Sequence, residues 1–172
     1  GQYPSGVPDK YFIDFNKYPQ FDQLPYFKNL GSVLNVDTYG YYGGSITEDF
    51  NNDGFQDIFT TSTDLETNVV YYVSDGNGGY LDKTSHAGLD GITGGSHCTQ
   101  ADFNNDGFTD IYIVRGGWLQ EKAGKNHPNS LLQNNGDGTF TDITNKAGLL
   151  YYYGSHTASW GDYNNDGWID LF

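Results

Sequence analysis

Three nine-residue segments of the sequence carry oxygen-bearing side chains at the same spacing. Each segment has the pattern Asp-x-Asn-Asn-Asp-Gly-x-x-Asp, and the three occupy residues 49–57, 102–110 and 162–170. A curled loop can point the side chains at positions 1, 3 and 5 toward one centre, and Gly at position 6 permits the sharp turn. Carboxylate, amide and carbonyl oxygens are the ligands that hard divalent cations take. The pattern therefore predicts a cation site in each segment.

Calcium is the cation that this ligand set favours. Zinc and copper prefer His or thiolate ligands, and magnesium needs a tighter octahedron and gives up its waters reluctantly. Each loop would supply side chains from positions 1, 3, 5 and 9 and the main-chain carbonyl of position 7, so we expect about three calcium ions per chain. The predicted ligands are Asp49, Asn51, Asp53, Phe55 and Asp57 in the first loop, Asp102, Asn104, Asp106, Phe108 and Asp110 in the second, and Asp162, Asn164, Asp166, Trp168 and Asp170 in the third.

Two other interpretations of the loops are weaker. A helix-loop-helix calcium motif needs a bidentate Glu at position 12, where the first two loops carry Thr60 and Ile113. Asn-Asp-Gly could be turn chemistry alone, but a turn does not need carboxylates at positions 1, 5 and 9, which repel one another when no cation is bound. The Asn at position 4 of each loop is interpreted as a turn former whose side chain points outward. These residues are Asn52, Asn105 and Asn165.

The charge of the chain excludes several classes of partner. The 172 residues include 22 acidic and 8 basic side chains, for a formal net charge of −14. Such a chain repels phosphate backbones, so we expect no nucleic-acid partner. No stretch approaches the roughly 18 consecutive apolar residues of a membrane span, so we expect no transmembrane segment. Cys98 is the single cysteine, which excludes an intrachain disulfide and favours a buried, inert thiol.

The sequence between the loops repeats as well, and it predicts short strands. Residues 70–82 and 130–142 share a hairpin pattern, with tight turns at Asn77-Gly78 and Asp137-Gly138, and Ala-Gly-Leu follows each. With the strands on either side of each loop, one unit holds four antiparallel strands, which matches a blade of a β-propeller. The predicted fold is therefore all-β, a propeller of four-stranded blades. It is incomplete at about two and a half blades, because a ring needs about four to eight.

The repeats divide the chain into four parts. The N-terminal part includes a strand at 11–15 that could close a blade, and each later part holds one calcium loop. Because two and a half blades do not close a ring, we expect further blades from the same chain or from another. The parts are 1–40, 41–90 with loop 49–57, 91–150 with loop 102–110, and 151–172 with loop 162–170.

These motifs resemble FG-GAP repeats, also called VCBS repeats, of integrin-α-like β-propellers. The resemblance rests on Asp-Phe-Asn-Asn-Asp-Gly-Phe-x-Asp-Ile at 49–58 and 102–111, on the run at 134–144, and on Ala-Gly-Leu at 147–149. It is strongest to the cartilage acidic protein family and its bacterial relatives, which often carry an ASPIC/UnbV segment. The resemblance covers about residue 41 to the end, whereas the later blades and the ASPIC/UnbV segment of that family are not in this sequence.

The resemblance implies a seven-bladed propeller with calcium in its hairpin loops. It also implies a secreted or cell-surface protein that binds a protein or glycan partner at the cell surface or in the matrix. The predicted function is accordingly a non-enzymatic interaction module in which calcium is structural. The alternative is a polysaccharide-active enzyme, a lyase or hydrolase, because the wider repeat class includes such enzymes. The sequence shows no set of acid and base residues for catalysis beyond the loop carboxylates.

Direct ligand contacts are predicted in the longest insertion between strands, residues 115–128. Long loops on rigid scaffolds often carry binding residues. Arg115 and Trp118 are the candidates within this loop. The competing interpretation is that Trp118 packs beneath its own loop.

Overall fold

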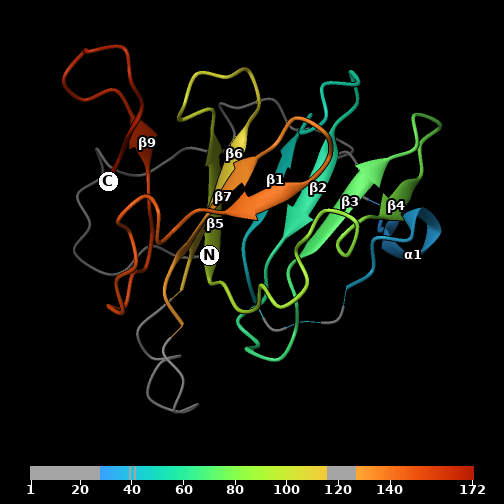
Figure 1. Ribbon diagram of the computed structural model, residues 1–172. Helices are drawn as coiled ribbons and strands as arrows, with labels where there is room; N and C mark the ends of the chain where they lie inside the picture. Colours follow the sequence, from blue (N-terminus) through green and yellow to red (C-terminus); the bar gives the residue numbers. More distant parts are fainter. Residues whose placement is uncertain (1–27, 39, 41, 116–126) are drawn as a thin grey trace, which may run out of the picture. The chain divides into compact units, whose positions relative to one another are not determined.

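The protein's structure is a computed structural model that describes residues 28–38, 40, 42–115 and 127–172 (Figure 1). The chain separates into two units, residues 1–30 and 31–172. The described helix and strands all belong to the second unit, which begins with the short helix α1 (Gly31–Leu34). The strand predicted at 11–15 lies outside the described residues. No helix in the described ranges is long and apolar enough to cross a membrane.

The strands form two four-stranded antiparallel sheets and a two-stranded one. Within each four-stranded sheet the strands follow one another in chain order, β1-β2-β3-β4 and β5-β6-β7-β8. This arrangement confirms the four-stranded blades expected from the repeats. The first sheet comprises β1 (Ser45–Glu48), β2 (Asp57–Thr60), β3 (Val70–Ser74) and β4 (Tyr80–Asp82). The second comprises β5 (His97–Ala101), β6 (Asp110–Val114), β7 (Ser130–Asn134) and β8 (Phe140–Asp142), and the third β9 (Trp160–Gly161) and β10 (Asp170–Leu171).

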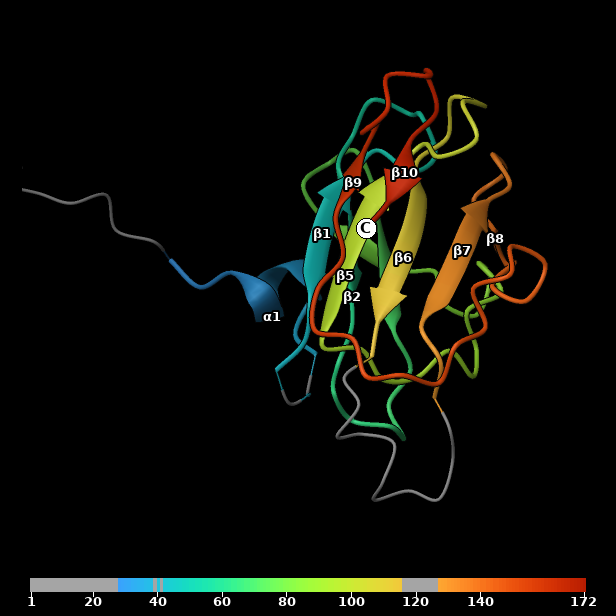
Figure 2. The same ribbon diagram turned by 90° about the vertical axis from the view of Figure 1, so that its left-hand side faces the viewer.

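Each predicted cation loop joins the first two strands of its sheet. The last pairs before the loops are Glu48 with Asp57, Ala101 with Asp110, and Gly161 with Asp170. The Asp at position 9 therefore starts the second strand in all three sheets. Figures 1 and 2 show the three loops at the same end of the strands, and β1 contacts β5 while β5 contacts β9. Sheets whose first strands lie next to one another are the arrangement of propeller blades.

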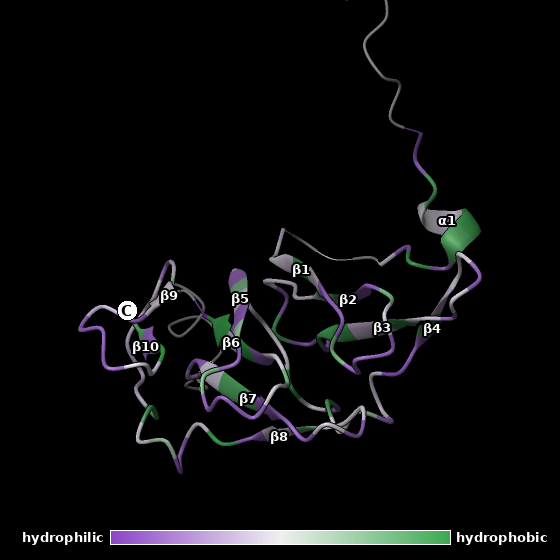
Figure 3. Cartoon of the chain, turned by 90° about the horizontal axis from the view of Figure 1, so that it is seen from above, coloured by the Kyte–Doolittle hydropathy of each residue, from purple (hydrophilic) through white to green (hydrophobic). Residues whose placement is uncertain are grey.

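The core lies between successive sheets, and β6 is buried on both of its faces. Ile111 and Ile113 belong to the cluster shared with the first sheet, whereas Tyr112 and Val114 belong to the cluster shared with the third. Successive side chains of a strand point to opposite faces, so one apolar run serves two interfaces. Figure 3 shows the hydrophobic colour on β6 and β7 and a hydrophilic colour in much of the connecting loops.

Aromatic rings close the interface between the first two sheets. Phe50 follows the first position of loop 49–57, Tyr71 lies on β3, and Phe140 starts β8. The three rings meet edge to face, with centroids 5.5 to 5.9 Å apart. This geometry is the favoured one for aromatic pairs, and it fixes the first loop against the neighbouring sheet.

The hairpin turn of the second sheet packs against its cation loop, and this contact requires Gly136. A Cβ at Gly136 would lie 2.6 Å from the ring carbons of Phe108, whereas a Cβ at Gly138 would meet nothing within 4 Å. Both glycines have positive φ, +75° and +82°, so replacement by Ala costs about 1–2 kcal/mol of backbone strain at either position. We expect Gly136→Ala to lower the free energy of unfolding by about 1–3 kcal/mol more than Gly138→Ala, because it also overpacks.

Urea unfolding of the two glycine variants measures this difference. Equal stability of Gly136→Ala and Gly138→Ala would show that the Phe108 ring moves aside without cost.

Candidate metal centres

The first loop gathers the oxygens of positions 1, 3 and 5 by hydrogen bonds within the loop. The Asp53 N–H donates to Asp49 Oδ1 (2.9 Å) and to Asn51 Oδ1 (3.0 Å), so these two oxygens converge on one atom. Asn51 Nδ2 donates to Asp53 Oδ2 (2.9 Å), which holds the side chains of positions 3 and 5 together. Gly54 N–H donates to Asp49 Oδ2 (2.8 Å). The loop therefore curls around its own acidic side chains, as the spacing predicts.

The same network recurs in the other two loops. Position 5 N–H donates to the side-chain oxygens of positions 1 and 3 at 3.0 and 3.1 Å in loop 102–110, and at 3.1 and 2.9 Å in loop 162–170. The amide of position 3 donates to the carboxylate of position 5 at 2.7 and 2.9 Å. Position 6 N–H donates to position 1 at 2.9 Å in both loops. Three segments far apart in the sequence thus share one local geometry.

Position 4 of each loop has a left-handed backbone. Asn52, Asn105 and Asn165 have φ of 57°, 56° and 57°, a region that Asn enters more readily than most residues. Their interpretation as turn formers is confirmed. Two of the side chains do not simply point outward, however. Asn52 Nδ2 donates to Gly107 O (3.2 Å) and Asn105 Nδ2 donates to Gly167 O (3.3 Å), each in the next loop along the chain.

Position 9 lies apart from the rim of the loop, inside the sheet. Asp57 is 0% exposed, and its carboxylate accepts hydrogen bonds from the Tyr71 hydroxyl (2.9 Å) and from Ser74 N–H (2.9 Å). Burial raises the pKa of Asp57 above its ordinary value, although these hydrogen bonds oppose the change. Neither Tyr71 nor Ser74 could be recognised from the loop pattern, because both belong to β3.

The second sheet repeats this arrangement at Asp110, where the rise in pKa is larger than at Asp57. Asp110 is also 0% exposed and accepts from Asn134 N–H (2.8 Å) and Phe103 N–H (3.2 Å). Burial raises the pKa of Asp110 to about 6, and the nearby carboxylates of Asp106 and Asp102 add to the rise. A positive charge among these carboxylates would favour their ionised forms.

The described residues fit a hard cation in ligand type, although their carboxylates are not gathered as a metal cluster. Within the described ranges, no group of three or more His, Cys, Asp or Glu side chains is close enough to hold a metal ion. The structure brings together positions 1, 3 and 5, of which position 3 is an amide and therefore falls outside such a group. The carboxylates of positions 1 and 5 accept loop N–H groups. A carboxylate has about four lone-pair sites, so accepting hydrogen bonds leaves room for a cation.

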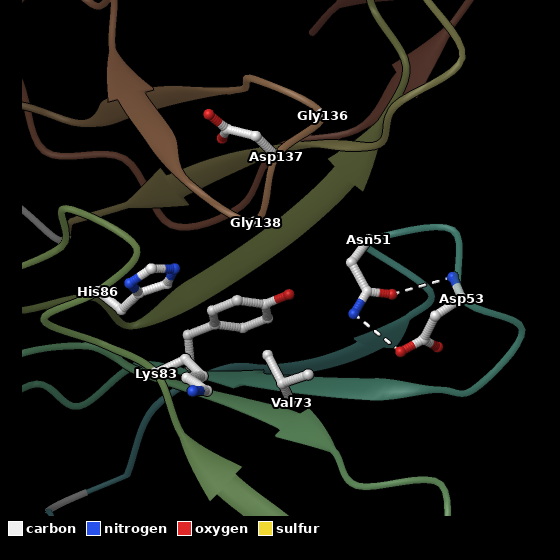
Figure 4. A pocket seen from close by; sticks show the side chains of 9 residues that line it. Asn51, Asp53, Val73, Lys83, His86, Gly136, Asp137 and Gly138 are labelled. Carbon is white, nitrogen blue, oxygen red and sulfur yellow. Dashed lines mark hydrogen bonds between the residues drawn. The ribbon is translucent and has the colours of Figure 1, made fainter.

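A cavity of about 340 Å³ opens beside the first loop (Figure 4). Asn51 and Asp53 line one side of it, Lys83 and His86 line another, and Asp137 from the turn of the second sheet completes it. The cavity therefore lies between two successive sheets and combines two acidic side chains with two basic ones.

Of the two residues predicted to contact a ligand in residues 115–128, the structure describes only Arg115. Trp118 lies outside the described residues. Arg115 is only 4% exposed; its Nε donates to Thr93 O (2.8 Å) and its Nη1 donates to Pro128 O and to Ser130 Oγ. Burial lowers the pKa of Arg115 to about 10. The guanidinium is thus engaged within the protein and ties the end of β6 to neighbouring segments.

Comparison with known proteins supports the repeat assignment. A family model described as FG-GAP-like repeat matches residues 49–113 and 121–172, more than half of the chain. Cartilage acidic protein 1 of Xenopus tropicalis is 35% identical over 86 residues, which make up 49% of this chain. The match spans 12% of the length of that relative. These similarities confirm the resemblance identified from the loop and hairpin motifs.

Proposed function

Because this chain belongs to the FG-GAP-like repeat family, we propose that it is a calcium-binding interaction module built on propeller blades. One calcium ion would sit in each of the loops 49–57, 102–110 and 162–170. The observation that carries the proposal is the common hydrogen-bond network, which draws the oxygens of positions 1, 3 and 5 together in all three loops.

The ligands would be the side chains of positions 1, 3, 5 and 9 with the carbonyl of position 7. Bound calcium supplies positive charge that offsets the clustered carboxylates and ties each loop closed. Asp57 and Asp110 would contribute from inside their sheets, where burial already disfavours their charged forms. Calcium therefore has a structural role in this proposal, and the blades provide the surface for a partner.

The calcium stoichiometry tests the proposal. In calorimetric titration of the metal-stripped chain, we expect three calcium ions to bind and magnesium to bind much more weakly, because its smaller octahedral shell suits these loops poorly. The double variant Asp49→Asn/Asp53→Asn should lose one ion. Asp137→Asn, which changes an exposed acid outside the loops, should retain all three. Absence of binding at millimolar calcium would contradict the proposal and would show that the loops are turns without a cation site.

We further propose that the module works outside the cell, with a protein or glycan partner at the cell surface or in the matrix. The support for this location is the 35% identity over 86 residues to a protein whose name places it in cartilage, cartilage acidic protein 1. The same titration gives the relevant affinity, since calcium sites of extracellular modules have dissociation constants of about 10⁻⁴–10⁻³ M. Binding to arrays of matrix proteins and glycans should require calcium. Nanomolar calcium affinity, or no binding on either array, would contradict this part.

A further inference from the structure

Two amide side chains connect the first cation loop to the second. The first is Asn52, whose Nδ2 donates to the carbonyl of Gly107 at 3.2 Å across the interface between the sheets. Asn52 lies between the proposed ligands Asn51 and Asp53. The Gly107 carbonyl belongs to the same peptide group as the Phe108 N–H, which donates to Asp106 Oδ1 at 2.9 Å. A single peptide group therefore joins Asn52 of one loop to a proposed ligand of the next.

The second connection is Asn134 at the end of β7, which is 1% exposed. Its Nδ2 donates to Phe50 O in the first loop (2.7 Å) and to Thr109 O in the second (3.1 Å). Its backbone N–H donates to Asp110 Oδ1 (2.8 Å). One buried residue thus holds the main chains of both loops and the carboxylate at position 9 of the second.

We propose that Asn52 and Asn134 couple cation binding at loop 49–57 to cation binding at loop 102–110, so that each event raises the affinity for the other. This inference rests on the proposed calcium function and adds regulation to it: the sites fill cooperatively rather than independently. Asn105, which donates to Gly167 O, repeats the first connection between the second loop and the third.

The physical basis is the shared cost of ordering. A bound cation fixes the loop backbone around it, and this places the donor of Asn52 or the acceptor of Gly107 in its hydrogen-bonding position. The neighbouring loop then loses less conformational freedom when it binds its own cation, which gives positive cooperativity. Polarisation acts in the same direction, because donation to Gly107 O strengthens the donation of Phe108 N–H to Asp106. One or two net hydrogen bonds support a coupling of about 3- to 10-fold in affinity.

The test reads one loop while the other is disabled. Terbium is the probe, since a Trp at position 7 sensitises its luminescence and calcium displaces it. The double change Phe55→Trp/Trp168→Phe moves the position-7 Trp from the third loop to the first. Because Trp160 stays near the second and third loops, the luminescence gained over Trp168→Phe alone is the signal of loop 49–57. Calcium affinity at that loop is then measured with loop 102–110 intact and with Asp102→Asn/Asp106→Asn.

Disabling the second loop should weaken calcium binding at the first by about 3- to 10-fold, the coupling expected from one or two net hydrogen bonds. In Asn52→Gly, which keeps the left-handed backbone but lacks the amide, this factor should fall toward one. Asn134→Ser should reduce it as well. Ser is the residue of the first sheet at this position: Ser74 Oγ accepts from Gly76 N–H (3.2 Å) as Asn134 Oδ1 accepts from Gly136 N–H (3.0 Å).

A matched control separates coupling from general stability. Asn165→Gly makes the same backbone change in the third loop and should leave the coupling factor between the first two loops unchanged. Asn52→Gly could instead weaken calcium binding at loop 49–57 equally, whether loop 102–110 is intact or disabled. The coupling factor would then be unchanged, Asn52 would be only structural, and the inference would fail while the calcium proposal stands. If the chain with intact loops binds no calcium, both fail together.

Discussion

Removing calcium should lower the melting temperature of this chain by roughly 20 °C. A ligand that binds only the folded state adds about 2.7 kcal/mol per site at a free concentration of 100 Kd, so three sites that are each filled to this degree add roughly 8 kcal/mol. One kcal/mol shifts the melting temperature of a chain of about 150–250 residues by roughly 2–4 °C. Melting curves followed by circular dichroism, in excess calcium and in chelator, measure the shift.

A variant that lacks the carboxylates at positions 1 and 5 provides the control. Changing Asp to Asn at these positions in all three loops removes two proposed carboxylate ligands per loop and keeps the Asp at position 9, which is buried in the first two loops. This variant should melt at the same temperature in calcium and in chelator. It should also be more stable than the unmodified chain in chelator, since fewer like charges repel one another. Identical melting of the unmodified chain in both conditions would contradict a structural role of calcium.

Replacement of Asp110 by Ala should destabilise the protein by about 3 kcal/mol even when no calcium is present. The substitution leaves the buried N–H group of Asn134 and the partly buried N–H group of Phe103 without their acceptor. Each unsatisfied buried donor costs about 1–3 kcal/mol. Burial, and to a lesser degree repulsion by Asp106 and Asp102, raises the pKa of Asp110, and relief of this unfavourable charge offsets part of the loss. Urea unfolding in the presence of chelator measures the effect.

Asp106 in the same loop is the matched comparison for this prediction. Its side chain is exposed and its hydrogen-bond partners belong to the loop itself. Asp106→Ala should therefore change the stability in chelator by much less than Asp110→Ala, while it abolishes the additional stabilisation by calcium at that loop. Equal losses for the two variants in chelator would show that position 9 has no structural function beyond the metal site.

Short-range signals in the sequence account for most of the fold. The hairpin turn at Asn77-Gly78, the Ala-Gly-Leu segments and the repeated loops each depend on neighbours within a few residues, and their strands appear where they were expected. The curl of the loops was also predictable, because the oxygen at position 1 and the Gly at position 6 lie five residues apart and meet within one turn.

Contacts between sheets could not be predicted in the same way. Asn134 and Phe50 are 84 positions apart, and nothing in the sequence around either indicates that one amide joins two loops. Arg115 was predicted to contact a ligand because it opens a long insertion. In the structure its guanidinium donates to the carbonyls of Thr93 and Pro128, which lie on other segments. The pattern identifies which residues can bind through oxygen, but only packing decides which partner each one meets.

The double burial of β6 has a consequence for how the chain unfolds. Half of its apolar side chains complete the interface with the first sheet and half complete the interface with the third, so the middle sheet has no face of its own to expose. In repeat proteins, stability is approximately a sum of intrinsic terms and nearest-neighbour terms, and the apolar burial of β6 contributes to the nearest-neighbour terms on both sides. The middle repeat is therefore not an excisable folding unit. Its β6 amides exchange with solvent only when both flanking interfaces have opened, which makes their exchange rate a measure of the cooperativity of the whole array.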